Sequence, residues 1–168
     1  MNISTEHKAV IRREAIGSAI ANGLFAALFV WLLVPKEGKA MTGDQGLDID
    51  IAVTTFLTIW LMSLFMTPLI GRQIRLKQAP ELNLVWSQHL ILRYLPEKTG
   101  RRSAMLALIG TVLLSPPLIA IVYALGIDPW SFQLVLAAKI GYGIILGLAF
   151  GPVIALAALV RPPLAANQ

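Results

Sequence analysis

The 168-residue chain contains no cysteine, only two histidines and few charged residues. Without thiols, disulfides, thiolate metal sites and cysteine nucleophiles are excluded. His7 and His89 are the only imidazoles, and no His/Asp/Glu cluster has the spacing of a metal site, so we expect no metal and no cofactor. Charged residues make up 14% of the chain, whereas a soluble domain carries about 25%. This deficit indicates a polytopic membrane protein.

The usual signatures of catalysis are also missing. The sequence has no P-loop, no G-x-S-x-G or H-E-x-x-H motif, and no dinucleotide-binding glycine motif in a suitable context. The tripeptide GYG at 141–143 is similar to part of a potassium filter, but it lies in an apolar run and lacks the preceding Thr-Val. A lipid-modifying enzyme would need His89, Glu81 or Glu97 beside a headgroup pocket, and no nucleophile–base pair is suggested. We therefore do not expect an enzyme.

The chain is hydrophobic on average, with a mean hydropathy of +0.72, and it contains four long apolar segments. They cover residues 15–34, 51–70, 103–125 and 130–160. Each is long enough to cross about 30 Å of hydrocarbon, and a spanning backbone that must satisfy its own hydrogen bonds favours helices. We predict an all-α integral membrane protein in which residues 1–168 form one domain of four transmembrane helices, arranged as two sequential hairpins. The first segment resembles a signal peptide, but its 20 apolar residues fit a retained span.

Basic residues gather on one side of these segments. Three precede the first segment, seven lie between the second and third, and one follows the fourth, which makes eleven of the 14; the other side has only Lys36 and Lys39. This bias predicts that both termini and the long loop are cytoplasmic, with the chain in the inner (plasma) membrane. We expect these side chains at the membrane surface: Arg72, Arg75, Lys77, Trp86, Arg93, Arg101 and Arg102. Their charge suits anionic lipids, so we expect membrane lipids, and not nucleic acid, as partners.

The segment 81–95 lies in the long cytoplasmic loop between two prolines. Its apolar residues recur at helical spacing, and it carries two side chains that favour the membrane interface, Trp86 and Tyr94. We predict a short amphipathic helix along the cytoplasmic membrane surface. The alternative is a docking surface for a soluble partner.

The two halves of the chain share a short pattern. RREA at 12–15 and RRSA at 101–104 open the two predicted hairpins, while LFMTPLI at 64–70 and LAFGPVI at 148–154 close them. Both hairpins would run in the same direction, which predicts a parallel internal repeat about an axis along the membrane normal, as many carriers have. The alternative is a chance similarity between two apolar hairpins.

Small residues form a stripe in the fourth segment. They recur at every fourth position: Gly143, Gly147, Gly151 and Ala155. Small side chains let two helices approach closely in lipid, where packing replaces the hydrophobic drive for association. The stripe therefore predicts a helix contact, whose partner is a helix of the same chain, a second copy in a homo-oligomer, or another membrane subunit.

Polar or helix-breaking residues inside the spans are the candidate ligand-binding set: Asn22, Ser115, Pro116, Pro117 and Lys139. Lys139 lies about 13 Å beyond Trp130 along a helix, where it could snorkel outward, pair with an outer carboxylate such as Asp50 or Asp128, or contact an anion or a lipid headgroup. Asn22 calls for an interhelical hydrogen bond or a ligand. Adjacent prolines should kink or break the third helix, which marks either a binding site or a change of helix direction.

These features lead to two functional hypotheses. The first is a transport component, a small permease or its membrane subunit, with a site where the hairpins meet. The second is a non-transporting accessory or scaffold subunit that assembles through the glycine stripe of the fourth helix.

Overall fold

A computed structural model describes residues 5–34, 46–79, 96, 98–126 and 130–160. The described residues form four α-helices and no β-strand: α1 (Thr5–Leu33), α2 (Leu47–Arg75), α3 (Thr99–Ala124) and α4 (Phe132–Leu159). All four are long and apolar enough to cross a membrane. The predicted all-α class and the four candidate spans are therefore confirmed. The interfacial segment 81–95, with Trp86 and Arg93, lies outside the described residues.

α1, α2 and α3 begin before the apolar segments that predict them, and α2 also ends later than its segment, whereas α4 lies within its predicted segment. α1 starts ten residues before the predicted boundary at 15, and α2 continues five residues beyond 70. Hydrophobicity marks the part of a helix that meets lipid. The polar flanks of α1 and α2 contain Arg, Glu, Lys and Gln, which are good helix formers, so the helices continue through them.

α3 is not broken at Pro116 and Pro117, because it is a continuous helix from Thr99 to Ala124. The alternative that the two prolines kink the helix stays a prediction. Each proline lacks the N–H that would bond the carbonyl four residues earlier. Those carbonyls belong to Val112 and Leu113, whose side chains, like the prolines, are exposed on the outside of the bundle. α3 therefore remains helical, and the two carbonyls that lack an N–H partner lie on its exposed outer face.

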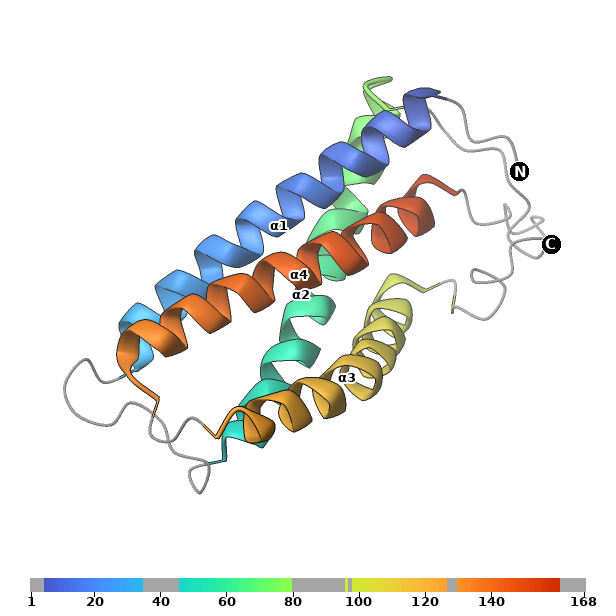
Figure 1. Cartoon of the computed structure of the whole chain (residues 1–168). Coiled ribbons are helices and arrows are strands. Elements are labelled where there is room, and N and C mark those ends of the chain that lie inside the picture. Colours follow the sequence, from blue (N-terminus) through green and yellow to red (C-terminus); the bar gives the residue numbers. More distant parts are fainter. Residues whose placement is uncertain (1–4, 35–45, 80–95, 97, 127–129, 161–168) are drawn as a thin grey trace.

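Successive helices run in opposite directions, so the start of α1, the end of α2, the start of α3 and the end of α4 share one end of the bundle (Figure 1). The closest helix pairs are α1 with α4, α2 with α3, and α2 with α4. α4 and α2 therefore lie between α1 and α3. The predicted arrangement as two sequential hairpins is not confirmed, because the tightest contact joins the first and last helices. The internal repeat stays a prediction.

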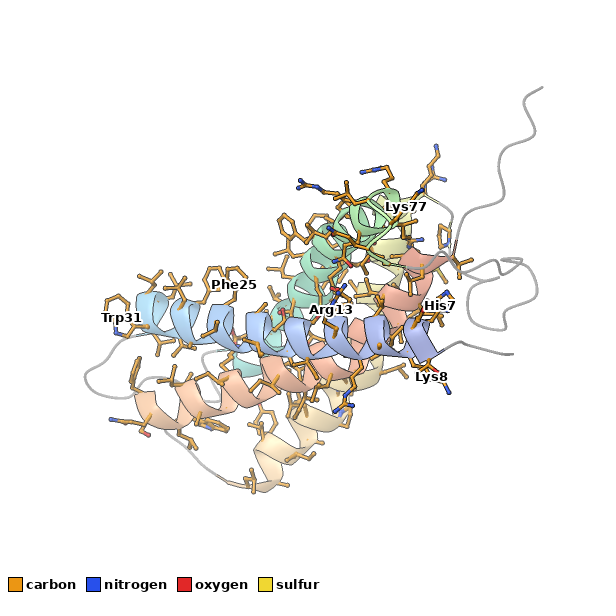
Figure 2. All side chains as sticks on the ribbon, turned by 90° about the horizontal axis from the view of Figure 1, so that it is seen from above. His7, Lys8, Arg13, Phe25, Trp31 and Lys77 are labelled. Carbon is orange, nitrogen blue, oxygen red and sulfur yellow. The ribbon has the colours of Figure 1, made fainter. Side chains whose placement is uncertain are left out.

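The centre of the bundle is packed with side chains. Ile59 and Leu146 are fully buried there, and Gly110 of α3 lies so close to Ile59 and Phe150 that an added Cβ would be 2.3 Å and 2.7 Å from their nearest side-chain atoms. The outer face of α1 is apolar and exposed, with Phe25 and Trp31 toward the end of the molecule opposite Lys8 and Lys77 (Figure 2). This distribution suits a bundle whose surroundings are lipid.

Candidate functional site

A polar cluster lies at the end of the bundle where α2 and α4 begin. Lys139 of α4 forms an ion pair with Asp50 of α2, and its Nζ also donates to Thr54 Oγ1 at 2.9 Å. The side chains of Lys139 and Asp50 are 16% and 33% exposed. We call these three residues the Lys139 cluster. Lys139 therefore pairs with a carboxylate, one of the alternatives that its sequence position left open.

A second cluster adjoins the Lys139 cluster. It consists of Thr55 of α2, Tyr142 of α4 and Ser115 of α3, and we call it the Thr55 cluster. Thr55 Oγ1 donates to the carbonyl of Ile51 at 2.6 Å and receives a hydrogen bond from Ser115 Oγ at 3.2 Å. It also bonds the Tyr142 hydroxyl. A threonine hydroxyl has one proton, so Tyr142 donates in this contact. Thr55 and Ser115 are 0% and 3% exposed.

These two clusters gather only part of the predicted ligand set. Ser115 and Lys139 lie in neighbouring clusters that are joined through Thr54 and Thr55 of α2. Pro116 and Pro117 are exposed on the outer face of α3 and line neither cluster. Asn22 lies on α1, where its Nδ2 donates to Met62 Sδ at 3.3 Å.

The hydroxyls of Thr54, Thr55 and Tyr142 were not singled out as site residues from the sequence. Threonine in an apolar helix is weak evidence because it can bond its own backbone, as Thr55 does here. The available signal was spacing: Asp50 and Thr54 lie four apart on one helix, and Lys139 and Tyr142 lie three apart on another. Such spacings place each pair on one helix face.

The glycine stripe of α4 packs against α1 of the same chain. A Cβ at Gly147 would lie 2.5 Å from Ala19 Cα, and one at Gly143 would lie 2.8 Å from the Asn22 carbonyl oxygen. At Gly151 the nearest atom is Ala15 Cα, at 3.0 Å. Ala155 is fully buried one turn further along α4. We call this contact the α1–α4 seam, and α1 already occupies it.

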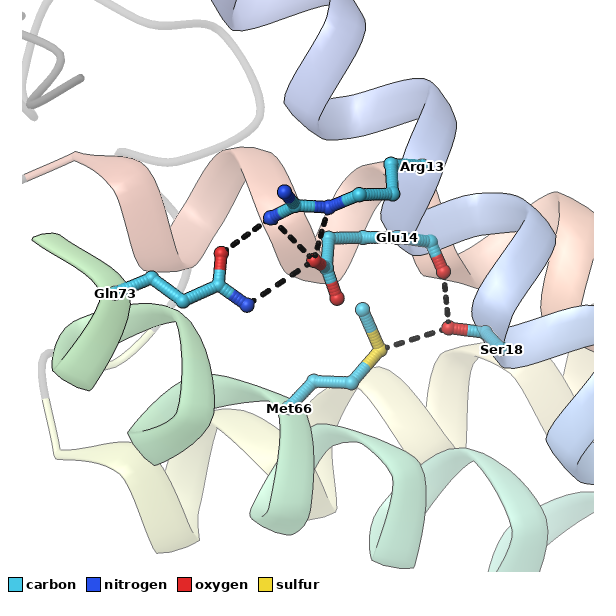
Figure 3. A network of polar contacts seen from close by, with 5 residues as sticks. All are labelled: Arg13, Glu14, Ser18, Met66 and Gln73. Carbon is cyan, nitrogen blue, oxygen red and sulfur yellow. Dashed lines mark hydrogen bonds and ion pairs between the residues drawn. The ribbon is translucent and has the colours of Figure 1, made fainter. Parts of the chain in front are cut away.

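A polar network fastens α1 to α2 near the opposite end of the bundle (Figure 3). Glu14 Oε1 accepts hydrogen bonds from Arg13 Nη2 at 3.1 Å and from Gln73 Nε2 at 3.3 Å. Arg13 also bonds the Gln73 side-chain oxygen. Ser18 Oγ lies 2.6 Å from the Glu14 carbonyl oxygen and 3.0 Å from Met66 Sδ. Side chains thus connect two helices that are not a close backbone pair.

Arg102 is not a surface side chain, contrary to the prediction. It is 5% exposed, and its guanidinium donates to the Ala157 carbonyl and to Thr67 Oγ1, both at 3.3 Å. Ala157 belongs to the last turn of α4, where carbonyls lack a partner in their own helix and attract positive charge. This contact accounts for the burial. The other predicted surface cations within the described residues are exposed: Arg72, Arg75, Lys77 and Arg101.

An open pocket lies between the start of α1 and the end of α2, with a volume of about 680 Å³. It is lined by Glu6, Ala9, Val10, Ile74, Arg75, Lys77, Gln78 and Ala79. The described residues contain no group of three His, Asp or Glu side chains that could hold a metal ion. The described bundle thus carries polar clusters at both ends and an open pocket between the start of α1 and the end of α2.

Comparison of the chain with protein-family models, with curated proteins and with solved structures found no match.

Proposed function

We propose that this small multi-pass membrane protein is a transport component of the inner membrane, either a small permease or the membrane subunit of one. The observation that carries the proposal is the pair of adjoining polar clusters on α2, α3 and α4, inside helices that are otherwise apolar. Ionisable side chains in a membrane span are costly and usually mark a path for a solute or an ion. The ion pair of Lys139 and Asp50 is such a case.

The Lys139 cluster is the proposed point of contact with a solute. Lysine has three N–H donors, and Asp50 and Thr54 use two of them, so no described residue takes the third, which we assign to a ligand. The partial exposure of Asp50 gives access from the end where α2 begins. The packed side chains around Ile59 and Phe150 block passage of a solute from this site to the opposite end of the bundle. A site open on one side and closed on the other is what one state of an alternating-access carrier requires.

Ligand-dependent thermal stabilisation of the purified protein in mild detergent tests this proposal. We expect at least one solute class, among carboxylates, phosphate, amino acids and metal cations, to raise the Tm. At 100 times its Kd a ligand stabilises by about 2.7 kcal/mol, which corresponds to a Tm increase of roughly 5–10 °C for a chain of this size. Lys139→Gln should abolish the increase, while Arg12→Gln, outside the cluster, should leave it unchanged. A flat panel with folded protein would contradict the proposal.

The proposed orientation places both termini in the cytoplasm, and two fusions test it. Alkaline phosphatase, which is active only outside the cytoplasm, is attached after residue 45 in one fusion and after residue 78 in the other. We expect activity from the first fusion and none from the second, because the basic residues concentrate on the side of residue 78. A fluorescent protein that folds only in the cytoplasm should give the reverse pattern. Equal signals at both positions would refute the orientation.

The second candidate function is an accessory subunit of a membrane complex, and the closed centre of the bundle favours it. The exposed apolar face of α1, which includes Leu24 at 67% and Phe25 at 59%, would then contact another subunit. The glycine stripe cannot serve as this contact, because α1 of the same chain covers it. An accessory subunit should give a flat ligand panel and a fixed stoichiometry with one partner by native mass spectrometry. Leu24→Ala should weaken that association without lowering the Tm.

A further inference from the structure

The pocket between the start of α1 and the end of α2 has a mixed lining. Val10 and Ile74 supply apolar walls, while Arg75, Lys77 and Glu6 supply two positive charges and one negative charge. Lys77 lies at the same end of the molecule as His7 and Lys8, and opposite Trp31 (Figure 2). The structure gives no hydrogen bond or ion pair to the side chains of Arg75 and Lys77 within the described residues. Both cations are thus available to a ligand.

The position of the pocket along the helices matches the headgroup layer of a bilayer. Val10 lies five residues before the apolar segment of α1, and Ile74 lies four residues after that of α2. At 1.5 Å per residue these offsets are about 6–8 Å. The headgroup region adds roughly 5–8 Å to each side of the hydrocarbon core. A molecule in the pocket would therefore sit at the depth of lipid phosphates, with the apolar wall leading toward the acyl chains.

Lys77 adopts a backbone conformation that lysine disfavours. Its φ is +56°, and it is the only described residue other than glycine with a positive φ. The Lys77 N–H bonds the Ile74 carbonyl at 3.0 Å, and the Gln78 N–H bonds the Gln73 carbonyl at 2.9 Å. These two bonds form a Schellman motif, and Lys77 holds the left-handed position where glycine is usual. A strained residue at a pocket is a reason to look for a function of its side chain.

We propose that this pocket binds an anionic phospholipid of the phosphatidylglycerol type. The lipid phosphate lies between Arg75 and Lys77, Glu6 accepts a hydrogen bond from the headgroup glycerol, and the acyl chains follow Val10 and Ile74. Two cations and one carboxylate leave a net charge of +1, which one phosphodiester neutralises. Phosphatidylethanolamine has an ammonium group in addition and would leave that charge uncompensated. Basic pockets beside transmembrane helices commonly bind anionic headgroups in this way. The proposal is independent of any transport function.

Lipid binding to the full chain in detergent, followed by native mass spectrometry, tests the proposal with equal amounts of phosphatidylglycerol and phosphatidylethanolamine. We expect the wild type to retain phosphatidylglycerol preferentially. Because one cation near a membrane surface changes lipid binding by about fivefold, Lys77→Gly and Arg75→Gln should each lower the preference by about that factor. Lys8→Gln, a cation at the same end that does not line the pocket, should leave it unchanged.

The Lys77→Gly variant separates a lipid site from a purely structural role. Glycine relieves the left-handed strain, so this variant should have an equal or higher Tm without lipid while it loses the phosphatidylglycerol preference. If Lys8→Gln reduces the preference as much, diffuse surface charge explains the binding and the proposal fails. It also fails if phosphatidylethanolamine binds equally, or if inorganic phosphate competes at the same concentration as the lipid. Arg75→Gln keeps the test decisive if Lys77→Gly does not fold.

Discussion

Replacing Gly147 by alanine is expected to lower the free energy of unfolding by about 2–3 kcal/mol, within the range for overpacking a well-packed contact. The added Cβ would lie 2.5 Å from both the Cα and the backbone nitrogen of Ala19. No side-chain rotation relieves a contact with backbone, so α1 and α4 must move apart. Their separation would loosen the whole α1–α4 seam, because Gly143 and Gly151 also contact α1 closely.

Two glycines in the same helices provide matched controls for this measurement. A Cβ at Gly141 of α4 or at Gly17 of α1 would meet no atom within 4 Å. Alanine at either position should therefore not lower the unfolding free energy and should raise it by up to about 1 kcal/mol, because alanine favours a helix over glycine. Unfolding of the purified protein by increasing SDS, followed by circular dichroism, gives the three values. A destabilisation by Gly141→Ala equal to that of Gly147→Ala would show that glycine content, and not the seam, is what matters.

The glycine stripe of α4 could be recognised from the sequence as a packing surface, but its partner helix could not. Its spacing of four residues identifies a packing face, because residues four apart lie on one side of a helix. The spacing does not identify the partner, since any helix with a compatible surface would fit. α1 meets the stripe with Ala15, Ser18 and Ala19, which are small as well. The complementary surface was present in the sequence, but a match between small residues is too common to choose a partner.

The burial of Arg102 and the continuity of α3 through its two prolines have a shared physical cause. Counting charges predicts the side of the membrane, but it does not say which face of a helix a charge occupies, and Arg102 turned inward to the end of α4. Proline predicts lost hydrogen bonds, but it does not say whether the helix breaks, and α3 continues with Pro116 and Pro117 on its exposed face. Both outcomes depend on the rotation of α3 about its own axis, which tertiary contacts fix.

The polar clusters depend on the same kind of information. The sequence places Lys139 and Asp50 near the same predicted side of the membrane, and they do form an ion pair. The contact of Thr55 with Tyr142 and Ser115 requires three helices to meet at one level. Helical periodicity shows which residues share one face of a helix. It does not determine how far each helix is shifted along the bundle or rotated about its own axis. Residues near a predicted boundary can therefore be paired from the sequence more readily than those deep in the bundle.

A double-mutant cycle on Lys139 and Asp50 is expected to show strong coupling between the two residues. Lys139→Met leaves a carboxylate without its partner, and Asp50→Asn leaves an ammonium with only Thr54 in the described structure. Loss of one member of a fully buried pair costs about 3–5 kcal/mol. Because both side chains here are partly exposed, we expect about 1–2 kcal/mol for each single variant. The double variant should be less destabilised than the sum of the two by about 1 kcal/mol, since no charge is left unpaired.

The same cycle distinguishes a structural ion pair from a transport site. If the pair only holds α2 to α4, the double variant should recover most of the stability, and no solute should shift the Tm of the wild type. If the Lys139 cluster binds a solute, the double variant should recover stability but not the ligand-induced increase in Tm, because the free N–H donor of Lys139 is gone. SDS unfolding and thermal shifts measured on the four proteins give both quantities. Strictly additive destabilisation would mean that the two side chains act independently and would remove the basis for the proposed site.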